Sequence, residues 1–175
     1  EVPNTEMMCV LELRDELNLQ LAKGKLQPKF LNIDLIVASP PCYEFSLAFS
    51  SPQAIASRNG GFDEYSPNME LIEATYEIIE ILKPRYHVIE NVRGSIRHFK
   101  KFGIEPTQIM KQTYVLYGKF PLIENKQYAT KKEKDTGSQD PLRANKRAII
   151  PFELSLNLRN AILNQKTIFD YGVKV

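Results

Sequence analysis

The sequence has very few of the side chains that form disulfides or bind transition metals. Its 175 residues include two cysteines, Cys9 and Cys42, and two histidines, and the cysteines lie too far apart for a CxxC pair. This scarcity excludes a small fold that is stabilised by several disulfides, and it excludes a zinc site built from cysteine and histidine. We therefore expect a reducing, intracellular and cytoplasmic setting.

Long apolar runs and a strong net charge are also missing. No segment approaches the roughly 20 apolar residues that a membrane-spanning helix needs, and no basic segment followed by an apolar run indicates a signal peptide. Lys and Arg number 23 against 21 Asp and Glu, a net charge of +2. Overall charge therefore indicates neither a membrane nor a nucleic-acid partner, and any basic patch must be local.

The sequence contains enough apolar material for one folded domain, with 43% hydrophobic residues. We expect a single domain over residues 1–175. Its pattern predicts strands at 33–38, 86–92 and 113–117, a loop with short helical turns at 43–66, and helices at about 5–25, 66–82 and 151–165. A strand, a helix and a strand in this spacing are typical of the parallel βαβ unit of an open α/β sheet.

Three segments carry more detailed predictions. The continuous apolar run at 33–38 predicts a strand buried on both faces of a sheet, and Ser66 and Pro67 predict the cap and first residue of the following helix. Residues 124–147 are rich in lysine and arginine, which predicts a loop or disordered arm. A solvated loop and a contact with a DNA backbone both remain open for this segment.

Two motifs that can carry chemistry follow the first two predicted strands. The segment Ser39-Pro40-Pro41-Cys42-Tyr43-Glu44-Phe45-Ser46 follows the first, and Glu90-Asn91-Val92-Arg93-Gly94 ends the second. In an open α/β sheet the loops beyond the carboxyl ends of the strands converge, and function collects there. The sequence therefore predicts a thiol and a carboxylate at one edge of the sheet.

Together, SPPCYEFS after DLIVA and ENVRG after YHVI resemble the PPCQxFS and ENV motifs of the cytosine-C5 DNA methyltransferases. LYGKFP and RAIIPFELSLNLRNAI resemble later stretches of compact members, so the resemblance runs over residues 34–162. It implies a partial Rossmann-like methyltransferase fold and the transfer of a methyl group from S-adenosylmethionine to C5 of a flipped cytosine in DNA. A restriction-modification or virus-like setting would fit such an activity.

The resemblance also assigns catalytic roles to the two motifs. It implies that Cys42 attacks C6 of cytosine, because a thiol is a strong nucleophile that is partly ionised near neutrality. Glu90 would donate a proton or a strong hydrogen bond to N3, and Asn91 would orient Glu90 or the base. Pro40 and Pro41 would form a rigid turn that presents the thiol and an apolar wall of the base pocket.

DNA contacts are assigned less directly. Ser46 is a candidate phosphate contact, and Arg58 lies in the loop at 43–66, which we expect to close over a flipped base. Tyr43 replaces the family's usual Gln, which changes contacts around the base. The family's QxRxR motif has no counterpart, because Lys111-Gln112-Thr113-Tyr114 stands in its place, and Arg93 and Arg97 are possible substitutes.

The family's Gly-rich cofactor turn is missing, because no FxGxG precedes Asp34. The chain also begins with Glu1 rather than methionine. We therefore expect a fragment without the first strands of the fold, one half of a split enzyme with a complementary N-terminal half or subunit, or a degenerate copy. Residues 124–147 would then be a basic loop or a short target-recognition insert.

Other functions stay open. A Ser-Pro-Pro turn before an aromatic residue also marks methyltransferases that act on exocyclic amino groups, although Cys42 at the aromatic position and the ENV motif favour carbon methylation. A truncated subunit could bind nucleic acid or a partner chain without catalysis, and RNA is an open alternative to DNA. The simplest structural roles are packing for Cys42 and helix capping for Glu90.

Overall fold

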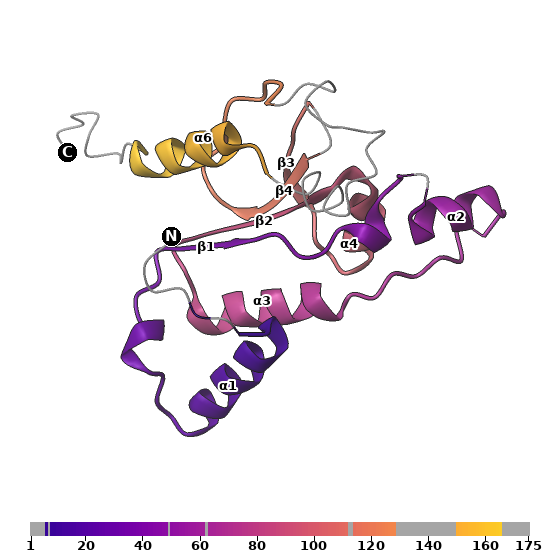
Figure 1. Ribbon diagram of the computed structural model, residues 1–175. Helices are drawn as coiled ribbons and strands as arrows, with labels where there is room; N and C mark the ends of the chain where they lie inside the picture. Colours follow the sequence, from indigo (N-terminus) through magenta and orange to yellow (C-terminus); the bar gives the residue numbers. More distant parts are fainter. Residues whose placement is uncertain are drawn as a thin grey trace. The chain divides into compact units, whose positions relative to one another are not determined.

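The computed structural model describes residues 6, 8–48, 50–61, 63–111, 114–128 and 150–165. The chain forms two compact units. The first comprises Glu1–Ile109 with Tyr114–Lys119, and the second comprises Met110–Thr113 with Phe120–Val175. Figure 1 shows the elements of both.

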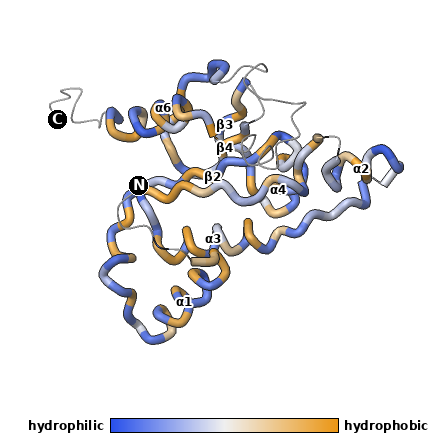
Figure 2. Tube along the Cα trace, viewed as in Figure 1, coloured by the Kyte–Doolittle hydropathy of each residue, from blue (hydrophilic) through white to orange (hydrophobic). Residues whose placement is uncertain are grey.

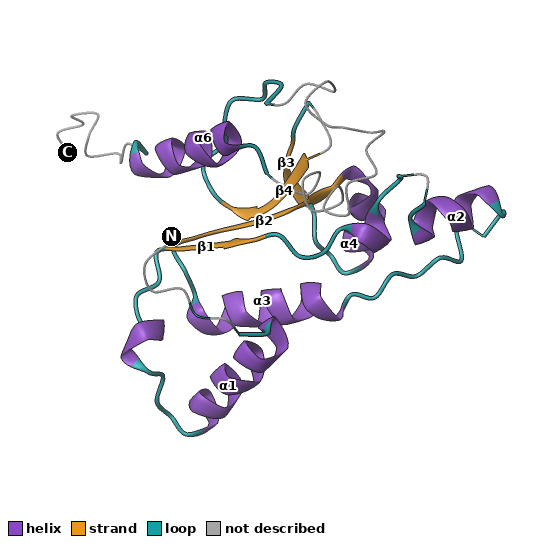
Figure 3. Ribbon diagram, viewed as in Figure 1, coloured by secondary structure: helices purple, strands orange, loops and turns teal. Residues whose placement is uncertain are grey.

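The first unit is built on a four-stranded mixed sheet in the order β1-β2-β4-β3 (Figure 3). The strands are β1 (Leu35–Ala38), β2 (Tyr86–Val92), β3 (Pro106–Ile109) and β4 (Tyr114–Lys119). β1 runs parallel to β2, whereas β4 runs antiparallel to both β2 and β3. The three predicted strands are confirmed, and β3 was not predicted.

The parallel pair is joined by a helical crossover, as the βαβ pattern predicts. The helices of this unit are α1 (Val10–Ala22), α2 (Pro52–Arg58), α3 (Glu70–Leu82) and α4 (Ile96–Lys101). Single 3-10 turns occur at Pro28–Phe30 (η1), Tyr43–Phe45 (η2) and Arg93–Ser95 (η3). α3 lies between the sheet and α1, which packs on its outer side (Figure 1).

The core of this unit lies between α3, the sheet and α4. The buried residues that contact one another there are Phe45, Met69, Ile72, Ile79, Ile89, Phe99, Val115 and Tyr117. The apolar residues of β2 and α3 appear as orange stretches in Figure 2. The Tyr117 hydroxyl shares a 2.7 Å hydrogen bond with Ser95 Oγ, which satisfies both buried hydroxyls.

The prediction that the first strand is buried on both faces is wrong. Leu35 is 37% exposed and Val37 is 56% exposed, whereas Ile36 and Ala38 pack against the core. The reason is topological, because β1 is an edge strand and one of its faces is uncovered among the described residues. The apolar run at 33–38 therefore predicts the strand correctly but does not show whether both of its faces are buried.

The predicted start of α3 at Ser66 and Pro67 is also wrong. The helix begins at Glu70, whose backbone N–H donates a 2.8 Å hydrogen bond to the side-chain oxygen of Asn68. The backbone N–H of Asn68 in turn donates a 2.7 Å bond to the Glu44 carboxylate. A contact with a segment 24 residues away thus fixes this end, and the local sequence pattern does not report it.

The second unit contains α6 (Phe152–Leu163), inside the predicted range 151–165. Leu154 and Leu158 are buried, whereas Phe152 is 78% exposed. Of the predicted basic loop at 124–147, residues 129–147 lie outside the described part of the chain. Across both units, none of the described helices is long and apolar enough to span a membrane.

Candidate active site

The turn after β1 presents Cys42 on a short, internally bonded segment. Pro40 and Pro41 have no backbone N–H and restrict the chain direction. The backbone N–H of Phe45 then donates a 3.1 Å hydrogen bond to the Cys42 carbonyl, which closes η2. The Cys42 thiol is reduced and the residue is half-buried, so the sulfur sits on a fixed backbone with access from outside.

The end of β2 places Glu90 and Asn91 beside this turn. The β1–β2 ladder ends at the pair Ala38 and Ile89, so the next two residues of β2 continue past the end of β1. Because side chains alternate along a strand, Glu90 and Asn91 lie on opposite faces of the sheet. Asn91 is completely buried and Glu90 is half-buried. The two polar residues therefore have different surroundings despite being neighbours.

Asn91 connects the two motifs directly. Its side-chain N–H donates a 3.3 Å hydrogen bond to the Pro40 carbonyl, and its side-chain oxygen accepts a 2.9 Å bond from the backbone N–H of Val92. A buried amide must satisfy its polar atoms inside the protein. The two hydrogen bonds of Asn91 satisfy its amide and link the turn that carries Cys42 to the end of the strand that carries Glu90.

A glycine allows the two turns to approach closely. A Cβ atom at Gly94 would lie 1.9 Å from the carbonyl oxygen of Phe45 and 2.9 Å from the side-chain nitrogen of Gln53. Because backbone cannot move away as a flexible side chain can, only glycine fits between η3 and η2. Gly94 stands in the second motif, but this close approach was not predicted, because the glycine follows the strand instead of interrupting it.

A buried pair of polar side chains anchors α2 to α4 behind the two turns. His98 Nε2 lies 2.7 Å from Gln53 Oε1, and both residues are almost fully buried. Burial, followed by the charges of Arg97 and Lys101, lowers the pKa of His98 below its ordinary value. The imidazole is therefore neutral near pH 7, and its hydrogen bond to Gln53 joins the two helices.

The other predicted DNA-contacting residues lie in the loop that follows Cys42 or just after β2. Tyr43 is 60% exposed and its hydroxyl donates a 3.2 Å hydrogen bond to the Ser50 carbonyl. Ser46 is half-buried, and its Oγ accepts a 3.0 Å bond from the backbone N–H of Ala48. Arg58 is exposed in the last turn of α2, and Arg93 is exposed in η3.

Arg97, the other arginine predicted as a substitute for the missing motif, forms an ion pair in this unit. Its guanidinium lies 3.3 Å from the Asp63 carboxylate, and that carboxylate is almost completely exposed. The pair connects α4 to the loop before α3. An exposed ion pair of this kind contributes little to stability.

Two hollows flank the Pro-Pro turn. The first, of about 210 Å³, is lined by Pro40, Pro41, Tyr43, Glu44, Phe45, Asn68, Leu71 and Ile72. The second, of about 250 Å³, is lined by Val10, Ala38, Ser39, Pro40, Pro41, Leu71 and Thr75. The turn forms a wall of both. Glu44 is the one carboxylate in the two linings.

Comparison with known proteins identifies a family. The family model for C-5 cytosine-specific DNA methylase matches residues 15–141, which includes both turns. Searches of curated proteins and of solved structures found no match. The match covers well over half of the chain.

Proposed function

Since the chain belongs to the C-5 cytosine-specific DNA methylase family, we propose that it contributes the nucleophile and the acid of a DNA (cytosine-5-)-methyltransferase active site. The observation that carries this proposal is the hydrogen bond from the buried Asn91 side chain to the Pro40 carbonyl. This bond keeps the Cys42 turn and the Glu90 strand end side by side. Addition to a cytosine ring requires a nucleophile and a proton donor, and we propose that Cys42 and Glu90 supply them.

Cys42 is the proposed nucleophile. Carbon 5 of cytosine is a poor nucleophile until a group adds at C6. The thiol first loses its proton to water, so that the attacking group is the thiolate. As the S–C6 bond forms, the C5=C6 double bond is lost, a C4=C5 bond forms, and the electron pair of the C4=N3 bond moves to N3. Cys42 is half-buried and directly precedes η2, and a short hydrogen-bonded turn suits an attacking atom.

Glu90 is the proposed proton donor in this step. The electron pair that arrives at N3 needs a proton. A carboxylic acid supplies this proton and becomes a carboxylate. The product is an enamine with a nucleophilic C5. Asn91 is a positioning residue in this proposal, because its amide contacts the turn that carries the nucleophile.

DNA is the proposed substrate partner, and the target base must leave the duplex to reach Cys42. Unstacking and unpairing a base costs a few kcal/mol. Tyr43 and Ser46 lie on the loop after Cys42, and Arg58 and Arg93 are exposed basic residues on the neighbouring α2 and η3. We propose that these residues contact the base and the phosphates around it.

S-adenosylmethionine is the methyl donor that the family implies, but the described residues do not fit a complete site for it. The two hollows at the Pro-Pro turn offer one carboxylate, from Glu44, beside prolines that cannot donate hydrogen bonds, and their other polar side chains are those of Ser39, Tyr43, Asn68 and Thr75. A donor with a ribose, an adenine and an amino-acid group needs more polar partners than these. We therefore propose that the described part of the chain supplies the groups for addition to cytosine, whereas binding of the donor needs further residues.

We infer that the donor site is completed by a complementary polypeptide that adds to the β1 edge. The order β1-β2-β4-β3, with a parallel pair at one end, fits one side of a Rossmann-like sheet. β1 is an edge strand with Leu35 and Val37 exposed, and such an edge can accept another strand. The poor fit of the donor to the described residues also favours one alternative, a subunit that binds nucleic acid without catalysis.

Transfer of a tritiated methyl group from S-adenosylmethionine to duplex DNA tests this function. The chain would be incubated with DNA alone and then with the Gly-rich, cofactor-binding half of another family member. The proposal expects label at cytosine C5 when the half is added, and little label without it. No label under either condition, with DNA binding retained, would support the binding subunit instead.

A further inference from the structure

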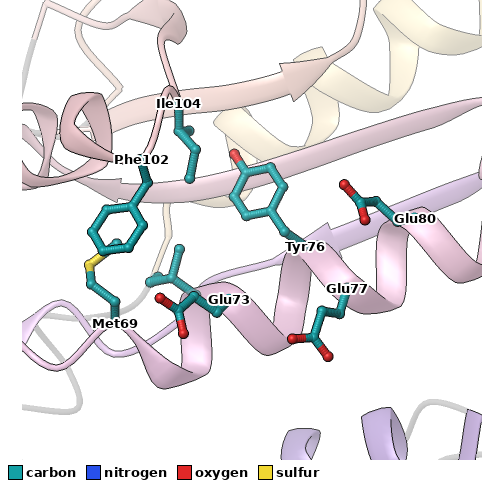
Figure 4. A pocket seen from close by; sticks show the side chains of 8 residues that line it. Met69, Glu73, Tyr76, Glu77, Glu80, Phe102 and Ile104 are labelled. Atoms are coloured by element: carbon teal, nitrogen blue, oxygen red, sulfur yellow. The ribbon is translucent and has the colours of Figure 1, made fainter. Parts of the chain in front are cut away.

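A large hollow among the described residues lies alongside α3, and its lining does not include Cys42. It has a volume of about 400 Å³ and is lined by Met69, Ile72, Glu73, Tyr76, Glu77, Glu80, Phe102 and Ile104. Six of these residues come from α3 and its N-cap, and two come from the segment between α4 and β3 (Figure 4). Neither the family match nor the proposed reaction assigns it a role.

The floor of this α3 groove is apolar and fixed. Met69 and Ile72 are buried members of the core, and Tyr76 and Ile104 pack against the same core. Phe102 is 52% exposed and stands opposite α3 (Figure 4). Because the floor belongs to the packed core, the groove exists before anything binds in it, which lowers the cost of binding.

The lip of the groove is acidic. Glu73, Glu77 and Glu80 are exposed and follow one another along α3 at a spacing of about one helical turn. Glu77 lies 3.7 Å from the Arg14 guanidinium. Glu73 and Glu80 make no ion pair with any residue in the described part of the chain.

The charge decides which kind of occupant fits. A nucleic acid or an anionic lipid surface would place its phosphates next to these carboxylates and would be repelled. A cationic group is attracted instead, and the faces of Tyr76 and Phe102 add favourable contacts for an ammonium or guanidinium. The occupant must therefore combine positive charge with apolar side chains.

The shape of the groove indicates a helix. The lining residues along α3 run from Met69 to Glu80, which is roughly 16 Å along a helix that rises about 1.5 Å per residue. An amphipathic helix of similar length would lay its apolar stripe on the floor and its basic side chains along the acidic lip. We propose that the α3 groove binds a basic amphipathic helix of a protein partner.

The groove also has a wall in common with the candidate active site. Ile72 lines both the α3 groove and the hollow beside the Pro-Pro turn. A helix bound on α3 would therefore contact Ile72, which also lines the hollow beside the Pro-Pro turn that precedes Cys42. The proposal itself does not depend on the methyltransferase activity, since it stands on the groove and its charge alone.

Fluorescence anisotropy with the full chain tests the proposal. The probe is a labelled synthetic helix of about 15 residues, with leucines on one face and lysines beside them. The matched control probe keeps the leucines and carries glutamates in place of the lysines. We expect saturable binding of the lysine probe, at least about tenfold weaker binding of the glutamate probe, and weakening by added salt.

Variants locate the binding site. The pair Glu73→Gln/Glu80→Gln should weaken the lysine probe about tenfold, and Phe102→Ser should weaken it as well. The control pair Glu64→Gln/Glu70→Gln removes the same charge from exposed residues outside the lining and should change affinity less than about twofold. Circular dichroism checks that each variant folds.

Three results would overturn the proposal. The first is equal affinity for the two probes, and the second is an equal loss in the two double variants. The third is a different occupant of the groove. It would be shown by self-association in sedimentation experiments or by binding of a duplex oligonucleotide, if Glu73→Gln/Glu80→Gln abolished that association or that binding. Each result would mean that the groove does not select a basic helix.

Discussion

The buried side chain of Asn91 donates a 3.3 Å hydrogen bond to the carbonyl oxygen of Pro40. The two residues lie 51 positions apart in the sequence, one at the end of β2 and the other in the turn after β1. The bond joins the segment of the proposed nucleophile to the segment of the proposed acid. The geometry of the candidate site therefore depends on this contact between the two motifs.

Asn91→Ala should loosen this connection. The substitution leaves the Pro40 carbonyl and the Val92 N–H without their partner, and an unsatisfied buried group costs about 1–3 kcal/mol. Urea unfolding should show a loss of that size, and thiol addition to a cytosine analogue should slow. The exposed Asn18→Ala in α1 serves as control and should stay within about 0.5 kcal/mol of the native chain. Equal stability of the two variants would count against the role of Asn91.

Gly94→Ala should lower the stability of the fold, although it adds only one methyl group. The new Cβ would lie 1.9 Å from the Phe45 carbonyl oxygen, so η2 and η3 would have to move apart. Overpacking of this kind costs about 1–3 kcal/mol or more, measurable by urea unfolding. At Gly61 the nearest atom would be 3.8 Å from the Cβ, so Gly61→Ala is the matched control. If both substitutions were equally mild, the close approach would not matter for stability.

The buried pair of His98 and Gln53 should make stability depend on pH. The pKa of His98 is lowered in the folded state, so the unfolded chain binds the proton more readily as the pH falls. The free energy of unfolding should therefore be highest above the ordinary pKa of histidine, about 6.5, and should decline as the pH falls below it. His98→Gln should reduce the decline measured between about pH 7.5 and pH 5.

Part of the pH dependence should survive in that variant. Burial and then the charge of Lys119 also lower the pKa of His87, which contributes in the same direction. A comparison of His98→Gln with His87→Gln separates the two contributions. An unchanged pH profile in His98→Gln would show that folding does not lower the pKa of His98.

Glu90→Gln should leave the fold intact and slow the proposed chemistry. An amide donates a hydrogen bond but cannot transfer a proton to N3, and general acid catalysis contributes about 10²–10⁴-fold. Single-turnover rates of thiol addition would measure the loss. Glu64→Gln is the control, because Glu64 is exposed and lies outside both hollows at the Pro-Pro turn. A rate equal to that of the control would exclude Glu90 as the acid.

The elements that the sequence predicts well are those set by local patterns. The bounds of β2 are the predicted ones, because Tyr86 to Val92 is rich in β-branched and aromatic residues and follows Pro84. β3 was missed, because its four residues PTQI begin with a proline and lack an apolar run. The predicted burial of β1 was wrong because β1 lies at the edge of the described sheet. The position of a strand within a sheet depends on its neighbouring strands, which the local sequence does not show.

The candidate site shows the same division. Two motifs at the ends of two strands are visible in the sequence, and a parallel pair brings them together. The contact between Asn91 and Pro40, the close approach at Gly94 and the pair of His98 with Gln53 were not predicted. Each depends on the packing of segments that are distant in sequence, and a single sequence does not report such packing.

The most direct test of the central claim is a covalent trap at Cys42. DNA would carry 5-azacytosine, whose nitrogen in place of C5 makes C6 more electrophilic, so that thiol addition does not need the methyl donor. Intact-mass spectrometry would compare the native chain with Cys42→Ser and with Cys9→Ser, in which the exposed second thiol is removed. The account predicts a DNA adduct in the native chain and in Cys9→Ser and none in Cys42→Ser. An adduct in Cys42→Ser, or none in the native chain with and without the complementary half, would contradict it.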